Sequence, residues 1–533
     1  MRRNHSLAWT RFTKSSGVNR LIPDPTFLIN HLETPSCLPF PSINSTETMQ
    51  LFTAELGRLL EQDRAPANNQ DVPDVICDRL SRTHLFTAIQ RRPYGRGWVI
   101  WVFGDLTQSE DGMPKQPPYS LLSVLASGSW LTAERAKLYP LVFLTIQALA
   151  YLGLVLAGHG NLDAFGRPIG TDFASFWTAS EFVLAGNAAN AYHPIQHHAA
   201  QTALWGKELD YYAWLYPPTA LLLVAPLGLL PYLASLFSWL AVTGAAYVAT
   251  IWKFTPRAEA LVPILGFPAA AVTNVAHGQN AFLSTAIVGI GLFISDRRPT
   301  AAGVLLGCLC YKPQLAPMLV IVVLARRNWK MALGAVLSIT AQIITATLLF
   351  GSDIWTNFES ILPLARAVLE EGLVGFGKMQ SVFAAVRLIG GGNSLAYCVQ
   401  AAVAVAAAIL LWRIWRSEAS LSLRTGATGA AMLLGTPFVL DYDFVLLALP
   451  IAALTSEGLR TGFKPYEKSV LAAAWILPLV ARLTAVHANI PLSPEIVMLL
   501  LVLIWKRASA DDAACVVAGP ETGWTRANQT VCY

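Results

Sequence analysis

The chain has 533 residues, of which 54% are hydrophobic and 13% are charged, against roughly a quarter charged in ordinary globular proteins. Residues 1–137 carry 28 charged side chains, one in five, whereas residues 138–506 carry 38, one in ten. This composition excludes a water-soluble globule over 138–506 and predicts an all-α polytopic membrane protein. The net charge of +5 is too small and too dispersed for a nucleic-acid-binding surface.

The first 137 residues are rich in Pro, Asn, Ser and Arg and show weak periodicity. Their first twenty residues hold five basic side chains and no acid, which is the bias of a transit peptide. A poorly ordered extension, or sequence upstream of the true start, is the simpler interpretation. We expect 1–137 to be an extension of unknown role, of which 1–125 is dispensable, 138–506 to be the transmembrane domain and 507–533 to be a polar cytoplasmic tail.

From Leu138 onward, apolar segments follow one another with short breaks, each near the ~20 residues that cross a bilayer core of ~30 Å. The sequence predicts about twelve transmembrane helices. They lie near 138–157, 217–230, 231–252, 259–275, 281–296, 299–325, 330–350, 395–411, 426–439, 443–455, 469–484 and 490–506. The stretch 299–325 is too long for one simple helix and contains Pro313, which indicates a broken helix or a hairpin.

Clusters of Lys and Arg between the spans orient the bundle, because such residues favour the cytoplasmic side. With twelve spans, most clusters fall on one side: Arg135 and Lys137; Arg326, Arg327 and Lys330; Arg413, Arg416 and Arg424; Arg460, Lys464 and Lys468; Lys506 and Arg507. We therefore expect a multi-pass protein of the cell (inner) membrane with both termini cytoplasmic. Arg297–Arg298 and Lys253–Arg257 do not fit this arrangement.

Two long segments, 158–216 and 351–394, then face outward. Each contains an amphipathic stretch, at 173–184 and 361–374, which is suited to lie along the membrane surface as a helix. A transporter usually keeps such loops short. Two substantial outer loops over a membrane bundle indicate an active site built at the outer surface.

The most informative motifs begin with Gly170-Thr-Asp and an aromatic-rich run, and they end at Tyr216-Pro-Pro. Further short motifs follow: His277-Gly-Gln-Asn, Tyr311-Lys-Pro-Gln, Arg326-Arg-Asn-Trp, Thr436-Pro-Phe and Asp441-Tyr-Asp-Phe. Their order over about 138–506 resembles the polyprenol-phosphate-sugar-dependent glycosyltransferases of the C-type fold. Within that fold the chain looks most like family 87, which is alpha-mannosyltransferase-like and includes many bacterial members.

The resemblance implies a hexosyltransferase that moves a mannose-like hexose, with inversion, from a polyprenyl-phosphate donor to a lipid or glycan acceptor on the outer membrane face. The donor is a co-substrate, and no cofactor is implied. Such transfer needs a carboxylate base and groups that hold the departing phosphate. In the family the base is an acid of the first outer loop, and the matching position is Asp172. Capping of the helix that starts at Phe173 is the structural alternative, and the two roles are compatible.

Lys312, Asp441 and Asp443 are charged positions beside or within apolar runs, where charge is costly and tends to be functional. We expect the two acids to line a substrate cavity, although a helix break with solvated carboxylates would give the same pattern. Lys312 is a candidate partner for the donor phosphate or for an intramembrane acid. A lysine that merely snorkels to the interface is the structural alternative.

Tyr216, Gln279 and Lys378 complete the candidate substrate-binding residues. Lys378 could reach phosphate from the second outer loop, although solvated loop charges are common. His277-Gly-Gln-Asn is either a loop at the catalytic face or a polar hairpin between spans. We assign no metal site. We interpret three His residues after Ala191 as polar side chains at the protein surface: His193, His197 and His198.

Two other classes of function remain open. A secondary transporter or lipid flippase would use Lys312, Asp441 and Asp443 as its pathway, but transporters commonly show inverted repeats and the sequence shows none. A surface-polysaccharide ligase or polymerase would also work at the outer face, from a lipid-diphosphate donor.

Overall fold

The computed structural model describes residues 120–206, 209–255 and 267–517, and four short strands nearer the N-terminus. The chain divides into two compact units, Met1–Pro117 and Pro118–Tyr533. In the first unit, β1 (Trp9–Thr10) pairs antiparallel with β2 (Ile22–Pro23), and β3 (Ala88–Arg91) pairs antiparallel with β4 (Trp98–Trp101). Most of the predicted extension 1–137, and the end of the predicted tail 507–533, lie outside the described residues, so this division into domains stays a prediction.

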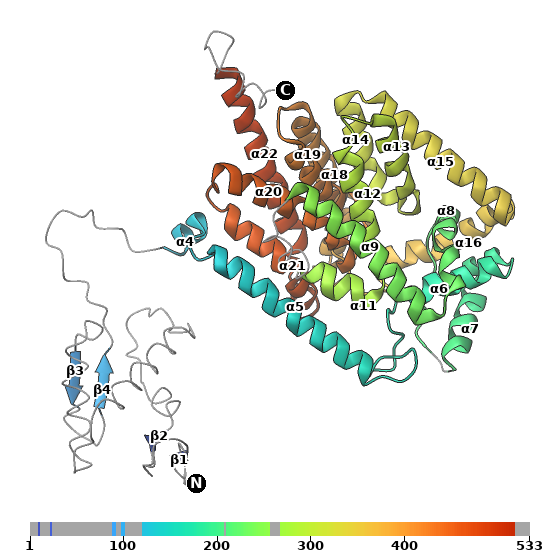
Figure 1. Ribbon diagram of the computed structural model, residues 1–533, viewed down its shortest axis with the longest axis horizontal. Helices are drawn as coiled ribbons and strands as arrows, with labels where there is room; N and C mark the ends of the chain where they lie inside the picture. The colour runs from blue at the N-terminus through green and yellow to red at the C-terminus, as the bar shows by residue number, and fades with distance from the viewer. Residues whose placement is uncertain are drawn as a thin grey trace. The chain divides into compact units, whose positions relative to one another are not determined.

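The described part of the second unit is helical (Figure 1). Its α-helices are α4 (Leu121–Ser127), α5 (Ala133–Leu156), α6 (Phe173–Leu184), α7 (Pro194–Trp205), α8 (Pro218–Val224), α9 (Tyr232–Phe254), α11 (Val275–His277), α12 (Ala281–Phe293), α13 (Pro299–Gly307), α14 (Ala316–Arg326), α15 (Trp329–Phe350), α16 (Asp353–Glu370), α17 (Val382–Leu388), α18 (Asn393–Arg416), α19 (Leu421–Gly435), α20 (Ala448–Thr461), α21 (Glu467–Ala488) and α22 (Ser493–Val517). Short 3-10 or π turns are η1 (Ala188–Tyr192), η2 (Ala225–Leu229), η4 (Ala269–Asn274), η5 (Cys308–Tyr311), η6 (Pro313–Leu315) and η7 (Asp441–Leu447).

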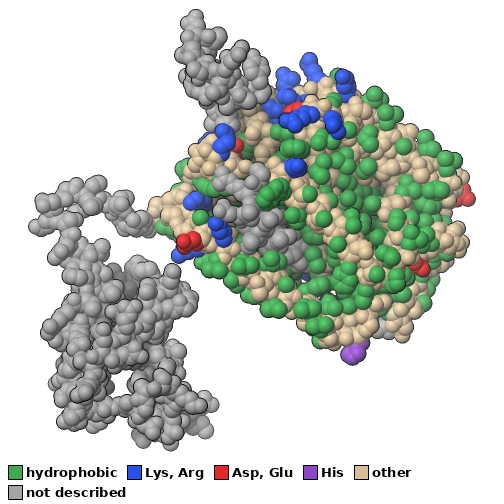
Figure 2. Space-filling model, in the orientation of Figure 1, with side chains coloured by type: hydrophobic (Ala, Val, Ile, Leu, Met, Phe, Trp, Pro, Cys, Tyr) green, Lys and Arg blue, Asp and Glu red, His purple; other side chains and the backbone are tan. Residues whose placement is uncertain are grey.

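The surface of this unit is apolar over a large area. Helix α5 buries only Pro140, while Leu138, Ile146 and Leu149 are among its exposed side chains. Figure 2 shows hydrophobic side chains over most of the visible face, with Lys and Arg gathered along one edge. Exposed apolar surface of this extent is not stable in water and marks contact with lipid. The unit is therefore a membrane-embedded helical bundle.

Six helical segments of the described residues are long and apolar enough to cross a membrane. They are Ala133–Leu156, Tyr232–Phe254, Trp329–Phe350, Asn393–Arg416, Asp441–Thr461 and Glu467–Ala488. Four other apolar segments have only 10–17 residues: Pro218–Leu229, Ala281–Phe293, Pro299–Tyr311 and Pro313–Arg326. The predicted twelve spans are therefore not confirmed.

Residues 299–326 form a hairpin whose two ends lie at the same end of the bundle. Helix α13 packs closely and in parallel on the start of α15, with Gly303 against the backbone of Met331 and Gly307 against Ser338. The chain turns at η5 and η6, because Pro313 cannot continue a helix. α14 then returns to Arg326, directly before α15. Of the two forms that the sequence allowed here, the structure has the hairpin.

Residues 217–231 form a second hairpin, which begins and ends against residues 158–216, the first outer loop of the predicted topology. The ring of Tyr216 lies 5.5 Å from that of Phe176, and Trp177 Nε1 donates to the carbonyl of Leu230 at 3.1 Å. Four prolines in 217–231 keep α8 and η2 short. The span predicted at 217–230 is thus corrected to a short hairpin, and α8 packs against η5 at the tip of the other hairpin.

Because of these two hairpins, the basic residues that did not fit the twelve-span arrangement lie at the same end of the bundle as the other Lys and Arg clusters. We call this end the basic end. Phe254, at the end of α9, contacts Phe293, at the end of α12, with ring centroids 5.8 Å apart. Asn328 donates to the carbonyl of Ser295 at 3.5 Å, which joins the end of α12 to the end of α14. Lys253, Arg297–Arg298 and Arg326–Arg327 are therefore neighbours, as the positive-inside rule requires. That the basic end is cytoplasmic stays a prediction.

Thiol labelling in intact cells tests this arrangement. With native cysteines replaced, His159→Cys and Glu371→Cys should react with an impermeant thiol reagent, because both positions are exposed in the outer segments. Arg297→Cys should be protected, since the hairpins place it at the basic end. Labelling at position 297 would restore the twelve-span arrangement, and protection of positions 159 and 371 would invert the bundle.

Deletion of residues 2–117 should leave membrane accumulation and stability unchanged, because the compact unit begins at Pro118. A deletion through residue 130 should lower both. It removes α4, whose Ala126 carbonyl accepts from Tyr466 N at 2.8 Å, and Trp130, whose Nε1 donates to Ser469 at 3.1 Å. Quantitative immunoblotting of membranes and thermal unfolding in detergent measure the two effects. Equal behaviour of both deletions would show that α4 contributes nothing.

Candidate active site

The carboxylate of Asp172 stands at the start of α6, yet it does not cap that helix. Its Oδ2 accepts a hydrogen bond from Gln279 Nε2 at 2.9 Å, and its Oδ1 lies 3.7 Å from His277 Nδ1. The side chain remains 28% exposed. The first outer loop thus presents an oriented, accessible carboxylate beside an imidazole, which is the arrangement that proton transfer needs.

A glycine brings these partners within reach of Asp172. Gly278 has φ +62°, in the left-handed region that favours glycine. A Cβ at this position would lie 2.6 Å from the Cβ of Phe173, which follows Asp172 in the chain. Gln279 N donates to Asn274 O at 3.1 Å and closes the turn. The His-Gly-Gln turn can therefore lie directly against the start of α6 only because its central residue has no side chain.

The electrostatic surroundings favour the charged forms of both Asp172 and His277. Burial raises the pKa of Asp172, but contact with His277, the amide of Gln279 and the charge of Lys378 together hold that pKa below 3.8. Burial lowers the pKa of His277, but Asp172 and Asp441 outweigh burial and Lys378, so that pKa lies above 6.5. The pair is thus an ionised carboxylate beside an imidazole that is more readily protonated than usual.

His277 also makes two contacts beyond Asp172. Thr171 Oγ1 lies 2.6 Å from its Nδ1, and the ring of Tyr442 lies edge-on with centroids 6.2 Å apart. The first contact fixes the ring on the side of the first outer loop. The second connects it to the Asp441-Tyr-Asp segment, which is distant in sequence.

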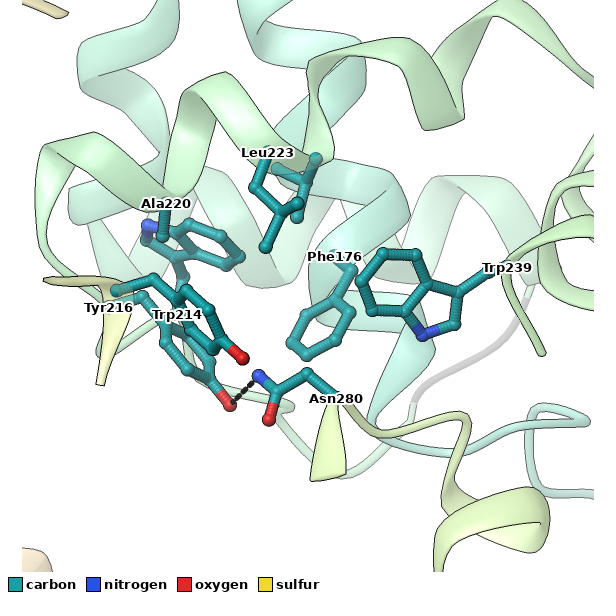
Figure 3. A pocket seen from close by; sticks show the side chains of 9 residues that line it. Phe176, Trp214, Tyr216, Ala220, Leu223, Trp239 and Asn280 are labelled. Carbon is teal, nitrogen blue, oxygen red and sulfur yellow. Dashed lines mark hydrogen bonds between the residues drawn. The ribbon is translucent and has the colours of Figure 1, made fainter. Parts of the chain in front are cut away.

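Tyr216 and Asn280 extend the network behind Gln279. Tyr216 OH donates to Gln279 Oε1 at 3.3 Å. It also accepts from Asn280 Nδ2 at 3.0 Å (Figure 3). Next to them, Phe176 and Trp239 are among the side chains that line a cavity of only about 10 Å³. The aromatic side chains therefore form a nearly solid apolar wall, and the polar edge of the site lies at Asp172 and Gln279.

A buried ion pair holds the Asp441-Tyr-Asp segment. Lys312, in the turn of the 299–326 hairpin, donates from Nζ to Asp443 Oδ1 at 2.6 Å, and both residues are less than 10% exposed. Asp443 Oδ2 accepts from the backbone N of Leu440 at 3.1 Å. Lys312 Nζ also lies over the face of the Tyr442 ring, 5.2 Å from its centroid, in a cation–π contact. The ion pair thus fixes the ring that contacts His277.

The remaining two candidates are Asp441, which begins this segment, and Lys378, which belongs to the second outer loop. Asp441 Oδ2 accepts from Arg482 of α21 at 3.4 Å. Lys378 precedes Met379, which forms a β-bridge with Leu440, so the second outer loop is joined to the segment. The positive charge of Lys378 contributes to the lowered pKa of Asp172 and opposes the raised pKa of His277.

The structure thus gathers all seven candidate residues around one site, although their roles stay predictions. Sequence reasoning did not assign roles to three further residues: His277, Asn280 and Arg482. His277 and Asn280 belong to a motif that the sequence already singled out. Arg482 had a signal too, because a cation within an apolar stretch at 469–484 is costly unless it has a partner.

One interpretation of histidine is corrected by the structure. His197 is fully buried in α7 rather than at the surface, with ring contacts to Phe182 and Tyr211. Burial lowers its pKa to about 4, so it is neutral at ordinary pH. Among the described residues, no group of three or more His, Cys, Asp or Glu side chains could hold a metal ion.

A comparison with known proteins identifies the central part of the chain. Residues 214–439 match the model of glycosyltransferase family 87. The match to family 87 includes six residues of the site, and it supports a membrane glycosyltransferase. These residues are Tyr216, His277, Gln279, Asn280, Lys312 and Lys378. Asp172, Asp441 and Asp443 lie outside the part that matches family 87. No curated protein and no solved structure matches the chain.

Proposed function

We propose that the protein transfers a mannose-like hexose from a polyprenyl-phosphate donor to a hydroxyl of a lipid or glycan acceptor on the outer membrane face. The observation that carries the proposal is the Asp172 carboxylate, which is accessible, held by Gln279 and adjacent to His277. It lies in the first outer loop of a membrane bundle whose central part matches a glycosyltransferase family. A positioned base of this kind suits glycosyl transfer to a hydroxyl.

The chemistry that we propose is one displacement with inversion. The acceptor oxygen attacks the anomeric carbon, the bond from that carbon to the phosphate oxygen breaks, and polyprenyl phosphate leaves with the electron pair. Asp172 takes the acceptor proton. The amide of Gln279 fixes one carboxylate oxygen, so the other can face the acceptor.

Positive charge for the departing phosphate comes, in this proposal, from Lys378 and the imidazolium of His277. Lys312 supports the site through its pair with Asp443, which keeps Tyr442 beside His277. We assign Tyr216 and Asp441 to contacts with sugar or acceptor hydroxyls, since Tyr216 bonds to Gln279 and Asp441 begins the segment that contacts His277.

The pH dependence of kcat/KM tests this division of roles. Burial is outweighed by the contacts with His277 and Gln279, so the pKa of Asp172 is held below its usual range and we expect acid to lower activity only below the pH that protonates an ordinary aspartate. Burial lowers the pKa of His277, but Asp172 and Asp441 raise it overall, so the imidazolium persists to a higher pH than in a free histidine and is lost as the pH rises through the raised pKa. Activity should therefore decline on the alkaline side. His277→Gln should abolish that decline and lower activity at neutral pH, whereas an unchanged decline in His277→Gln would assign it to another group.

Transport is the second candidate function, because broken helices and an intramembrane ion pair are also found in transporters. Label transfer in detergent distinguishes the two classes, since detergent abolishes compartments. Purified protein should move label from polyprenyl-phosphate-mannose into a new product in a membrane lipid extract. Absence of transfer, together with lipid movement in sealed vesicles, would favour the flippase. Transfer only from a lipid-diphosphate donor would favour a polysaccharide ligase or polymerase.

A further inference from the structure

A polar hollow lies between the last turns of α18 and the middle of α22. It has a volume of about 400 Å³ and is lined chiefly by Trp412, Arg413, Arg416, Trp505 and Ser509. Helix α18 has 24 residues and starts at the second outer loop, so its last turn lies about 35 Å from its start. The hollow is therefore at the basic end of the bundle, away from Asp172, and the proposed hexosyl transfer does not use it.

The two guanidinium groups of this hollow differ from those of Arg460 and Arg507, which also lie near the basic end. Arg460 pairs with Glu457 at 2.5 Å, and Arg507 pairs with Glu467 at 2.6 Å. No acidic side chain that the structure describes pairs with Arg413 or Arg416, and both are exposed. Being three residues apart, they lie on one face of α18. Two exposed cations therefore line one hollow.

The chemistry of the lining fits a phosphate group. Arginine binds phosphate oxygens through paired N–H donors, and the serine hydroxyl of residue 509 adds a donor. Trp412 and Trp505 are large amphipathic rings of the kind that lies at the membrane interface. Basic pockets between transmembrane helices on the cytoplasmic side bind lipid head groups. The volume also exceeds that of a phosphate ion and leaves room for a headgroup.

We propose that this hollow binds the phosphate of an anionic membrane lipid at the basic end of the bundle. The two arginines hold the phosphate, while the two tryptophans flank the glycerol region at the edge of the apolar surface. Bound lipid would tie the end of α18 to the middle of α22, which contact each other.

The test uses the full-length protein in detergent, with lipid binding measured by native mass spectrometry and by thermal shift. The probes are dioleoyl phosphatidylglycerol, dioleoyl phosphatidylcholine and inorganic phosphate. Phosphatidylglycerol should bind and stabilise, whereas phosphatidylcholine and inorganic phosphate at the same concentration should not. Arg413→Gln/Arg416→Gln should weaken phosphatidylglycerol binding roughly 30-fold, from about a fivefold contribution per cation.

Arg297→Gln/Arg298→Gln is the matched control, since it removes the same charge at the same end but does not line the hollow. It should bind phosphatidylglycerol normally. Arg413→Lys/Arg416→Lys keeps the charge but not the paired donors, and it should lose less than the glutamine variant. Equal losses in the glutamine variant and the control would show general attraction and overturn the site. Unchanged binding in the glutamine variant would also overturn it, and equal binding of inorganic phosphate would overturn the lipid as its ligand.

Discussion

Asp172→Asn should lower the rate of hexosyl transfer by roughly 10²–10⁴-fold, the contribution of a positioned general base. Asparagine keeps the shape of the side chain, and its oxygen can still accept from Gln279 Nε2, which in the parent protein donates to Asp172 at 2.9 Å. It cannot take the acceptor proton. Folding and membrane insertion should therefore be unchanged, and a single-turnover assay with labelled polyprenyl-phosphate-mannose should isolate the loss in kcat.

Three variants serve as controls for this prediction. Asp172→Glu should lose less than Asp172→Asn, because it keeps the carboxylate. Asp441→Asn should act mainly on substrate binding, seen as a rise in KM. Asp443→Asn should in addition lower stability, because it leaves the buried Lys312 without its charged partner. If Asp172→Asn turned over at a near-normal rate while either of the other two abolished transfer, the base would lie in the Asp441-Tyr-Asp segment instead.

Lys312→Met should destabilise the folded protein by about 3–5 kcal/mol, because it leaves the buried Asp443 carboxylate without its partner. Adding Asp443→Asn should recover most of that loss, since the second change removes the unpaired charge and keeps an oxygen for the N–H of Leu440. Thermal unfolding in detergent measures both variants. The double variant should remain slow in transfer, because Tyr442 loses the cation that lies over its ring.

Arg366→Met is the matched control for that ion pair. Arg366 also pairs with an acid, Glu370, at 2.9 Å, but its side chain is exposed at the surface. Exposed pairs contribute little to stability, so this variant should unfold like the parent protein. A loss in Lys312→Met no larger than in Arg366→Met would mean that the buried pair does not hold the site together.

Sequence alone identified the membrane-embedded class, because charge is scarce over 138–506 and the apolar runs have the length of a bilayer core. It overcounted the spans where prolines shorten the helices, at 217–231 and 299–326. Hydrophobicity does not distinguish a hairpin that returns to its own side from a helix that crosses. A sign of this error in the sequence was that Arg297–Arg298 did not fall on the side of the other basic clusters. In the structure, residues 217–231 and 299–326 are hairpins, and Arg297–Arg298 then lie at the basic end.

The candidate residues of the site were recognisable because charged and amide side chains at breaks between apolar runs are few. The residues with which they interact could not be recognised from the sequence. Lys312 and Asp443 are 131 residues apart, and Asp172 and Gln279 are 107 apart. Such pairs depend on how the helices pack, which neither periodicity nor spacing encodes. The turn at Gly278 is an intermediate case, because its glycine was visible in the motif but its contact with Phe173 was not.

The close packing of α13 on α15 has a consequence for biogenesis. Gly303 lies against the backbone of Met331, and Gly334 lies against that of Thr300, so each helix needs the other's glycine. The ribosome makes the 299–326 hairpin before α15, so during that interval the hairpin can contact α8 and α12 but lacks α15, on which α13 packs most extensively. Insertion of this part of the chain must therefore be completed after synthesis of α15. A bulkier residue at Gly303 would then reduce the yield of assembled protein in the membrane, while the molecules that do assemble would keep their active site.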